Sequence, residues 1–395
     1  MQNTQRQFGL SSAIIVFMPA NQRQDFSRMR SALLEKNYGD TNFITGMRAF
    51  AALAVVLIHA GGAGFRELGI VGNNIADFGR AGVYVFFVIS GFSVASSYET
   101  SNGYLDYINK RLWRIAPLYY FWLAVSIFLG VTATYWQKQF NAGIDSYNVF
   151  LHAFFLGFLD YRITNSIIGV EWSISIEVFW YFAVPLLLVG GSDKVKTLGV
   201  LFFSLLVYLL AVKFSLVLPV DEENATLAMH WSPIPYVLAY ALGITAYRFR
   251  NICRHSNAVG NCVLALSVVL VGVYVSHPMI IAKILFDEFI FVSLVTTGLI
   301  LFGTNKSFLF RLIFTNSAAQ FLGVVSYGIY LCHLPLLSLI ARFDEPMLNN
   351  LTIRFVFVST LSVFVSAVTY YLFEQRFIHI GKKFGKRPLS SRVVT

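Results

Sequence analysis

The chain contains a series of apolar runs that are each long enough to cross a lipid bilayer. A transmembrane helix needs roughly 20 mostly apolar residues to span a hydrocarbon core about 30 Å thick. Only 13% of the 395 residues are charged, about half the share found in ordinary soluble domains. The sequence therefore predicts an all-α, polytopic transmembrane helical bundle. Its spans, about ten in number, are expected near residues 43–61, 80–98, 114–133, 172–190, 197–218, 232–250, 260–277, 284–303, 318–341 and 352–377.

A further apolar segment, residues 147–160, is too short to be counted as a span. It offers only about a dozen apolar residues and contains His152, which is typical of a re-entrant or interfacial piece. The charge distribution supports this interpretation, because with ten spans and both termini in the cytoplasm, 22 of the 30 Lys and Arg residues lie on the inner side. Adding an eleventh span would place the basic C-terminus outside, against the positive-inside rule.

The chain divides into three parts by composition. Residues 1–42 are a predicted cytoplasmic arm, since their one apolar patch is too short to span and four basic residues follow it before the first run. Residues 43–377 form the predicted transmembrane domain, and residues 378–395 a basic cytoplasmic tail. We expect no soluble domain, so any chemistry must take place within the bundle or at its mouths.

Charge and cysteine usage exclude several kinds of site. The net charge of +10 is explained by positive-inside anchoring, and the chain shows no nucleic-acid-binding module. Cys253, Cys262 and Cys332 form no CxxC pair and have no clustered histidines, so neither a disulfide framework nor a metal site is predicted. We expect these cysteines to be packing residues.

The first predicted span carries two ionisable residues, Arg48 and His59, separated by ten uncharged apolar residues. On a helix the two lie roughly 16 Å apart. Ionisable residues within a membrane are costly and usually face a cavity or a polar partner. His59 is therefore a candidate functional residue, although a histidine that only bonds a neighbouring helix is an equal alternative.

Two arginines lie at the predicted cytoplasmic end of the third span. Arg111 and Arg114 are three residues apart and so project from one face of a helix, with Pro117 just beyond them. Paired guanidinium groups suit a phosphate-rich ligand. An ordinary positive-inside anchor is the alternative that this spacing leaves open.

One carboxylate lies inside the fourth predicted span. Glu177 is about five residues below the outer end of that span and needs a partner there. His59 lies at a comparable predicted depth, so we expect a Glu177–His59 pair able to perform acid–base chemistry. Glu171 is closer to water and is expected to be a solvated loop residue.

Other polar residues within spans allow two interpretations. Ser90, in the second span, belongs to a group of small residues that favours close helix packing over nucleophilic chemistry, and no GxSxG motif surrounds it. Tyr330 and His333, in the ninth span, lie three residues apart on one face, and Pro335 follows two residues after His333. A structural and a functional role are both open for this pair.

Taken together, these residues resemble the integral-membrane acyltransferase-3 family of O-acyltransferases, which modify bacterial surface polysaccharides and some small molecules. The resemblance covers residues 43–377 and depends on the order of its motifs rather than on any single one. The last helix of family members commonly reads Glu-x-Pro, and this chain does not match that motif. Some relatives also carry an SGNH domain after the bundle, which we do not expect in this chain. The matching motifs are Arg48 with His59 as R-x10-H, FFVISGF at 86–92, Arg111 and Arg114 followed by Pro117, WSISIE ending at Glu177, and SYGIYLCHLP at 326–335.

The resemblance implies an enzyme in the bacterial inner (cytoplasmic) membrane, surrounded by lipid. It implies acetyl-CoA or another acyl-CoA as the cytoplasmic co-substrate, a glycan such as O-antigen or exopolysaccharide as the acceptor, and no permanently bound cofactor. Arg111 and Arg114 would bind CoA phosphates, and His59, oriented by Glu177, would deprotonate a sugar hydroxyl. Arg48 would hold the donor or stabilise the oxyanion, and an acyl-enzyme on His59 or Ser90 is an alternative to direct transfer.

Two other functions remain open for this sequence. Intramembrane His and Glu residues also serve as proton relays, so a secondary transporter is the main alternative. A structural scaffold for glycan assembly is the second.

Overall fold

The computed structural model describes residues 41–188, 193–214, 222–253, 256–278, 287–343 and 345–384. These residues form helices and connecting loops, with no strand among them. The predicted all-α fold is therefore confirmed. Residues 1–40, most of the predicted N-terminal arm, and residues 385–395 of the predicted tail lie outside the described residues.

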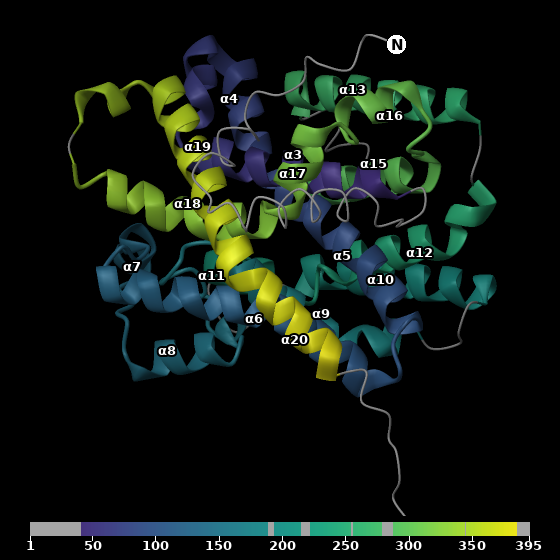
Figure 1. The fold of residues 1–395 in the computed structure, drawn as a ribbon, viewed down its shortest axis with the longest axis horizontal. Helices are drawn as coiled ribbons and strands as arrows, with labels where there is room; N and C mark the ends of the chain where they lie inside the picture. The colour runs from purple at the N-terminus through teal and green to yellow at the C-terminus, as the bar shows by residue number, and fades with distance from the viewer. Residues whose placement is uncertain are drawn as a thin grey trace, which may run out of the picture.

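Each of the ten predicted spans corresponds to helical structure (Figure 1). The ninth and tenth predicted spans are each made of more than one helix. The main helices are α3 (Asn42–His59), α5 (Ala81–Glu99), α6 (Tyr104–Leu129), α9 (Trp172–Leu187), α10 (Lys194–Phe214), α12 (Val237–Cys253), α13 (Asn257–Ser276), α15 (Glu288–Phe302), α17 (Ser317–Val324) with α18 (Ser326–Ile340), and α19 (Leu351–Thr369), which continues through a π-helical turn (Tyr370–Glu374) into α20 (Gln375–Phe384).

Six of the described helices are long and apolar enough to cross a membrane, and a seventh span would be formed by α17 and α18, which are bent by 67°. Helices α9 and α15 are apolar but have only 16 and 15 residues, so each rises about 24 Å or less. The chain is thus a multi-pass membrane protein, and the larger count of ten spans stays a prediction.

Residues 147–160 contain a short helix, α8 (Ser146–Ala153), which begins with the Asp145 carboxylate bonded to the Asn148 amide. Eight residues of helix rise about 12 Å, less than half of a bilayer core. Helix α8 lies beside α7 (Thr134–Phe140), at the lower left of Figure 1. This agrees with the prediction that the segment does not cross the membrane.

Helix α5 lies at the centre of the bundle, where it packs against α3, α12 and α15. Two glycines allow α5 and α12 to approach closely. A Cβ atom on Gly91 would lie 2.5 Å from the carbonyl oxygen of Tyr240, and one on Gly243 would meet the carbonyl oxygen of Val88. Gly91 of the second span therefore serves helix packing, as the sequence indicated.

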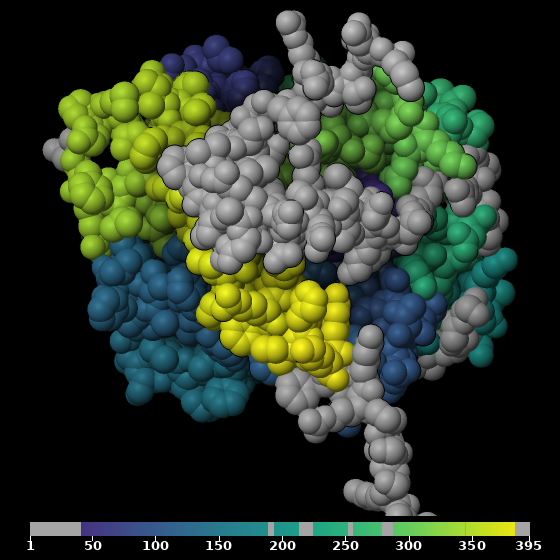
Figure 2. Space-filling model, viewed as in Figure 1, coloured from purple at the N-terminus to yellow at the C-terminus, as the bar shows by residue number. Residues whose placement is uncertain are grey.

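The C-terminal helices cross the surface of the bundle diagonally. Figures 1 and 2 show α19 and α20, in yellow, on this face, with α20 over α6. The Trp113 and Phe377 rings stack there at 5.7 Å, and Asn109 donates a hydrogen bond to the carbonyl of Gly381. The first residues of the predicted tail are therefore helical and packed against the bundle.

Candidate active site

His59 is the last residue of α3, and its ring faces a second histidine. The His59 Nδ1 atom lies 3.0 Å from Nε2 of His333, which comes from the middle of α18. His333 is fully buried, and its Nδ1 lies 2.7 Å from the carbonyl oxygen of Tyr330. Two residues far apart in the sequence thus form one imidazole pair.

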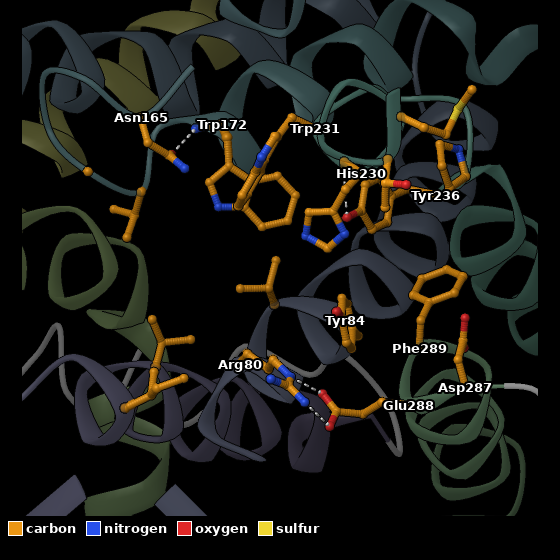
Figure 3. A pocket seen from close by; sticks show the side chains of 18 of the residues that line it. Arg80, Tyr84, Asn165, Trp172, His230, Trp231, Tyr236, Asp287, Glu288 and Phe289 are labelled. Carbon is orange, nitrogen blue, oxygen red and sulfur yellow. Dashed lines mark hydrogen bonds and ion pairs between the residues drawn. The ribbon is translucent and has the colours of Figure 1, made fainter. Parts of the chain in front are cut away.

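The pair borders a large cavity, because His59 lines a space of 570 Å³. Ligand pockets in proteins have about 300–1,000 Å³. Aromatic side chains form much of its wall (Figure 3), among them Trp172, Trp231, His230 and Tyr236. Helices α3, α5, α9, α10, α15 and α18, and α11 (Glu222–His230) with the segment after it, contribute to this wall.

Arg80 and Glu288 form a bidentate ion pair at one side of this cavity (Figure 3). The Arg80 Nε and Nη2 atoms donate hydrogen bonds of 2.8 and 3.0 Å to the two carboxylate oxygens. Tyr274 donates a third hydrogen bond to the same carboxylate. The pair ties the beginning of α5 to the beginning of α15, and neither residue was singled out from the sequence.

A second, smaller cavity of 80 Å³ collects the predicted arginines. It is lined by Arg48, Arg111 and Arg114, with Glu177 as the acidic residue in its lining. Arg48 donates a 2.8 Å hydrogen bond to the hydroxyl of Ser93, and Arg111 donates to the backbone carbonyl of the same serine. Residues from α3 and α6 therefore converge on one point of α5.

The excess of guanidinium groups over carboxylates makes this cavity suitable for an anion. Arg111 is buried, and its Nε atom has no hydrogen-bond partner among the described residues. An unpaired buried donor costs free energy until a ligand satisfies it. Phosphate groups pair well with such converging arginines.

Glu177 lies in the arginine cavity and does not contact His59. Its Oε1 atom accepts hydrogen bonds of 2.7 Å from Ser90 and 2.6 Å from Tyr181. The predicted Glu177–His59 pair is therefore wrong. The physical reason is depth: His59 ends α3, whereas Glu177 lies more than one turn inside α9, which begins at Trp172.

Tyr330 lies between the two cavities, and its side chain lines both of them. Its hydroxyl is 2.6 Å from that of Ser173 and donates a 3.0 Å hydrogen bond to the carbonyl of Val170. Both partners are at the N-terminal end of α9 or just before it. Tyr330, which the sequence left between two roles, is thus part of the wall of both cavities, whereas His333 lines neither and reaches the site through its contact with His59.

Glu171 is fully buried, so the prediction that it is a solvated loop residue is wrong. Its carboxylate accepts backbone N–H hydrogen bonds from Ile167, Ile168 and Gly169. The buried ring of His152 lies 3.5 Å away. These bonds replace water around the carboxylate and fix the loop before α9, whose residues form part of the large cavity's wall.

Glu374 occupies the end of the last predicted span, where the chain departs from Glu-x-Pro. It belongs to the π-helical turn Tyr370–Glu374 and is 4% exposed. It is close enough to Arg114 to interact with it electrostatically. The π turn therefore directs an acidic residue toward the arginine cavity, a role that the sequence did not reveal.

Comparison with known proteins assigns the chain to an enzyme family. Residues 41–371 match the acyltransferase domain that defines the acyltransferase-3 family. The chain belongs to this family. As a family member it is a membrane acyltransferase, and the arginine cavity and the imidazole pair are its candidate catalytic machinery.

Two curated proteins are similar to this acyltransferase at low identity. "Putative acetyltransferase ORF330" of Acidianus two-tailed virus is 27% identical over 314 residues, which cover 78% of this chain and 86% of that protein. "Nodulation protein 10" of Rhizobium leguminosarum bv. viciae is 27% identical over 181 residues, covering 39% of this chain and 46% of that protein. No solved structure matches the chain.

Proposed function

We propose that this acyltransferase transfers an acyl group, in the first instance acetyl, from cytoplasmic acyl-CoA to a hydroxyl of a surface glycan. It would do so in the bacterial inner membrane. The observation that carries the proposal is the arrangement of two cavities that share Tyr330 and Val83. One offers guanidinium groups suited to phosphates, and the other offers His59.

The donor would enter through the arginine cavity. Arg111 and Arg114 would bind CoA phosphates, since guanidinium groups pair well with phosphate oxygens. Arg48 converges with Arg111 on Ser93, which favours a role in holding the donor over a role at the oxyanion. The pantetheine arm would then extend past Tyr330 toward His59.

The acceptor would occupy the large cavity. Its aromatic wall suits the apolar faces of sugar rings, and its polar groups suit hydroxyls. His59 would take the proton of the acceptor hydroxyl as the oxygen attacks the thioester carbonyl. The C–S bond then breaks, and the proton passes from His59 to the departing thiolate, so CoA leaves as a thiol.

Direct transfer is favoured over an acyl-enzyme on Ser90. The Ser90 hydroxyl donates to Glu177 within the smaller cavity, and the same carboxylate oxygen accepts from Tyr181. Ser90 lines the arginine cavity only, whereas His59 lines the cavity proposed for the acceptor.

The test combines an acyl-transfer assay of the purified protein with mass spectrometry of the surface glycan. Purified protein in lipid nanodiscs should transfer label from radioactive acetyl-CoA to surface polysaccharide, and His59→Ala should lower the rate by at least about 10²-fold. Mass spectrometry should find acyl groups missing from glycans of a strain that lacks the gene.

Full activity of a well-folded His59→Ala variant would contradict the proposal. A protein that shows no thermal shift with CoA, yet moves protons or solutes across liposomes, would instead be a transporter. Unchanged glycan chemistry in cells that carry His59→Ala would point to a scaffold.

A further inference from the structure

We propose that His333 is the positioning residue for His59: it fixes the tautomer that leaves the His59 Nε2 atom unprotonated and able to act as the general base. This inference rests on the proposed function, because it assigns a role to a second residue of the same site. The geometry that points to it is a line of two hydrogen bonds that runs from the backbone carbonyl of Tyr330 through the His333 ring to the His59 ring, which lines the large cavity.

His333 lies at the buried end of this line. The His333 Nδ1 atom lies 2.7 Å from the carbonyl oxygen of Tyr330 and 3.2 Å from that of Ile329. A carbonyl oxygen can only accept, so Nδ1 must carry the hydrogen. In a neutral imidazole the other nitrogen is then an acceptor, and Nε2 of His333 therefore presents a lone pair to His59.

The position of the hydrogen on the His59 ring follows from its position on the His333 ring. The His59 Nδ1 atom is 3.0 Å from the His333 Nε2 atom, so Nδ1 must be the donor of this bond. The His59 ring also bonds the carbonyl of Val55, one helical turn earlier. In His152, His333 and His379 the contact to the carbonyl four residues earlier is likewise made by Nδ1. The bond to His333 therefore assigns the hydrogen to Nδ1 of His59, and a contact of Nδ1 with the Val55 carbonyl would agree with it.

The unprotonated Nε2 atom of His59 is what a general base requires. It belongs to a ring that lines the large cavity. When this atom takes a proton from the acceptor hydroxyl, the Nδ1–H donor becomes part of a cation and its bond to His333 becomes stronger. His333 thus selects the reactive tautomer before the reaction and stabilises the imidazolium during it.

The partner that positions His59 is the neutral ring of His333 and not a carboxylate. Among the residues that the structure describes, neither histidine has a hydrogen bond or ion pair with Asp or Glu. Glu177, the carboxylate that the sequence predicted for this role, instead accepts hydrogen bonds from Ser90 and Tyr181. Arg80 lines the same cavity as His59 but is paired with Glu288.

Three substitutions of His333 test the proposal, because they differ in whether an acceptor reaches His59. His333→Gln supplies an amide oxygen near the place of Nε2. His333→Asn supplies the same group on a side chain too short to reach it, and His333→Leu supplies none. We expect the leucine and asparagine variants to lose about 10²-fold or more in kcat, and the glutamine variant to retain clearly more activity than either.

Two readouts separate this role from a structural one. KM for acetyl-CoA and the thermal shift produced by CoA should stay near the wild-type values, because His333 does not line the arginine cavity. In the leucine and asparagine variants the rise of kcat with pH should move to lower pH, because protonated His59 has lost the acceptor that stabilises it.

Equal kcat in the glutamine and asparagine variants, or kcat of the leucine variant within about twofold of wild type, would overturn the inference and leave the proposed function standing. If the leucine variant does not fold, the two amide variants still decide the question. Full activity of His59→Ala would overturn the proposed function itself.

Discussion

The Ser90 hydroxyl donates a 2.7 Å hydrogen bond to Glu177. This bond, with the one from Tyr181, anchors the carboxylate beside the arginines and away from the imidazole pair. Glu177 therefore balances positive charge in the arginine cavity. In the proposed function, the site thus separates charge balance near the donor from acid–base chemistry near the acceptor.

Replacing Glu177 by Gln should alter donor binding and leave the base unaffected. We expect the KM for acetyl-CoA to change by roughly 3–10-fold, because the arginines lose a charged neighbour. The pH dependence of kcat should stay as in the wild type, since His333 is the partner of His59. A shift of the pH profile in Glu177→Gln would show that this carboxylate does act on the base.

Replacing Ser90 by Ala should affect stability more than chemistry. The variant leaves Glu177 with one fewer donor, so we expect a loss of about 1–3 kcal/mol in the free energy of unfolding, measured by thermal unfolding in detergent. Its kcat should stay within about tenfold of wild type, because the hydroxyl is not the nucleophile. Complete loss of activity, together with label retained on the wild-type protein after incubation with radioactive acetyl-CoA alone, would favour an acyl-enzyme.

Replacing Arg111 or Arg114 by Ala should weaken CoA binding, each by about 1–3 kcal/mol as one charge-assisted contact is lost. Lysine at either position should restore only part of the affinity, since an ammonium group cannot form the bidentate contact. Calorimetry with CoA measures both effects. Arg342→Ala, at an exposed arginine outside the cavity lining, is the matched control, and unchanged affinity in the double variant at 111 and 114 would reduce these residues to topology anchors.

Replacing Gly91 by Ala should destabilise the bundle, because the new methyl group would meet the backbone of α12 at Tyr240. Overpacking of this kind costs about 1–3 kcal/mol, measurable as a lower unfolding temperature. Gly272→Ala is the control, since a Cβ atom at Gly272 in α13 has nothing within 4 Å. Equal unfolding temperatures for the two variants would contradict the close contact between α5 and α12.

Single cysteines at Lys138 and Arg162 should both react with a membrane-impermeant maleimide in intact cells, in a background without Cys253, Cys262 and Cys332. Both positions lie between α6 and α9, where the helices are too short to cross. Arg162 is an exposed partner of Asp160, and its guanidinium lowers the pKa of that carboxyl, so its replacement should cost little. Labelling of only one position before permeabilisation would favour eleven spans and an external C-terminus.

The sequence by itself determined the class of the protein and several candidate residues of its site. Long apolar runs with few charges can satisfy their backbone groups in a membrane only as helices, and the structure has helices at all ten positions. The motif residues Arg48, His59, Arg111 and Arg114 could be selected because ionisable groups are rare within such runs. Their lining of two cavities that share Tyr330 and Val83 agrees with that selection.

Only the tertiary structure decided which of these residues are partners. Distance along a helix gives depth to within a turn, and His59 and Glu177 differ by about that amount, so the sequence paired them wrongly. Rotation about the axes of α3 and α18 turns His59 toward His333, and no periodicity within one helix can reveal this. Glu171 was misjudged for a similar reason, because its burial depends on backbone N–H groups of a folded loop that have no signature in residue type. The polar side chains could thus be found from sequence, whereas their hydrogen bonds depend on how separate helices begin, bend and face one another.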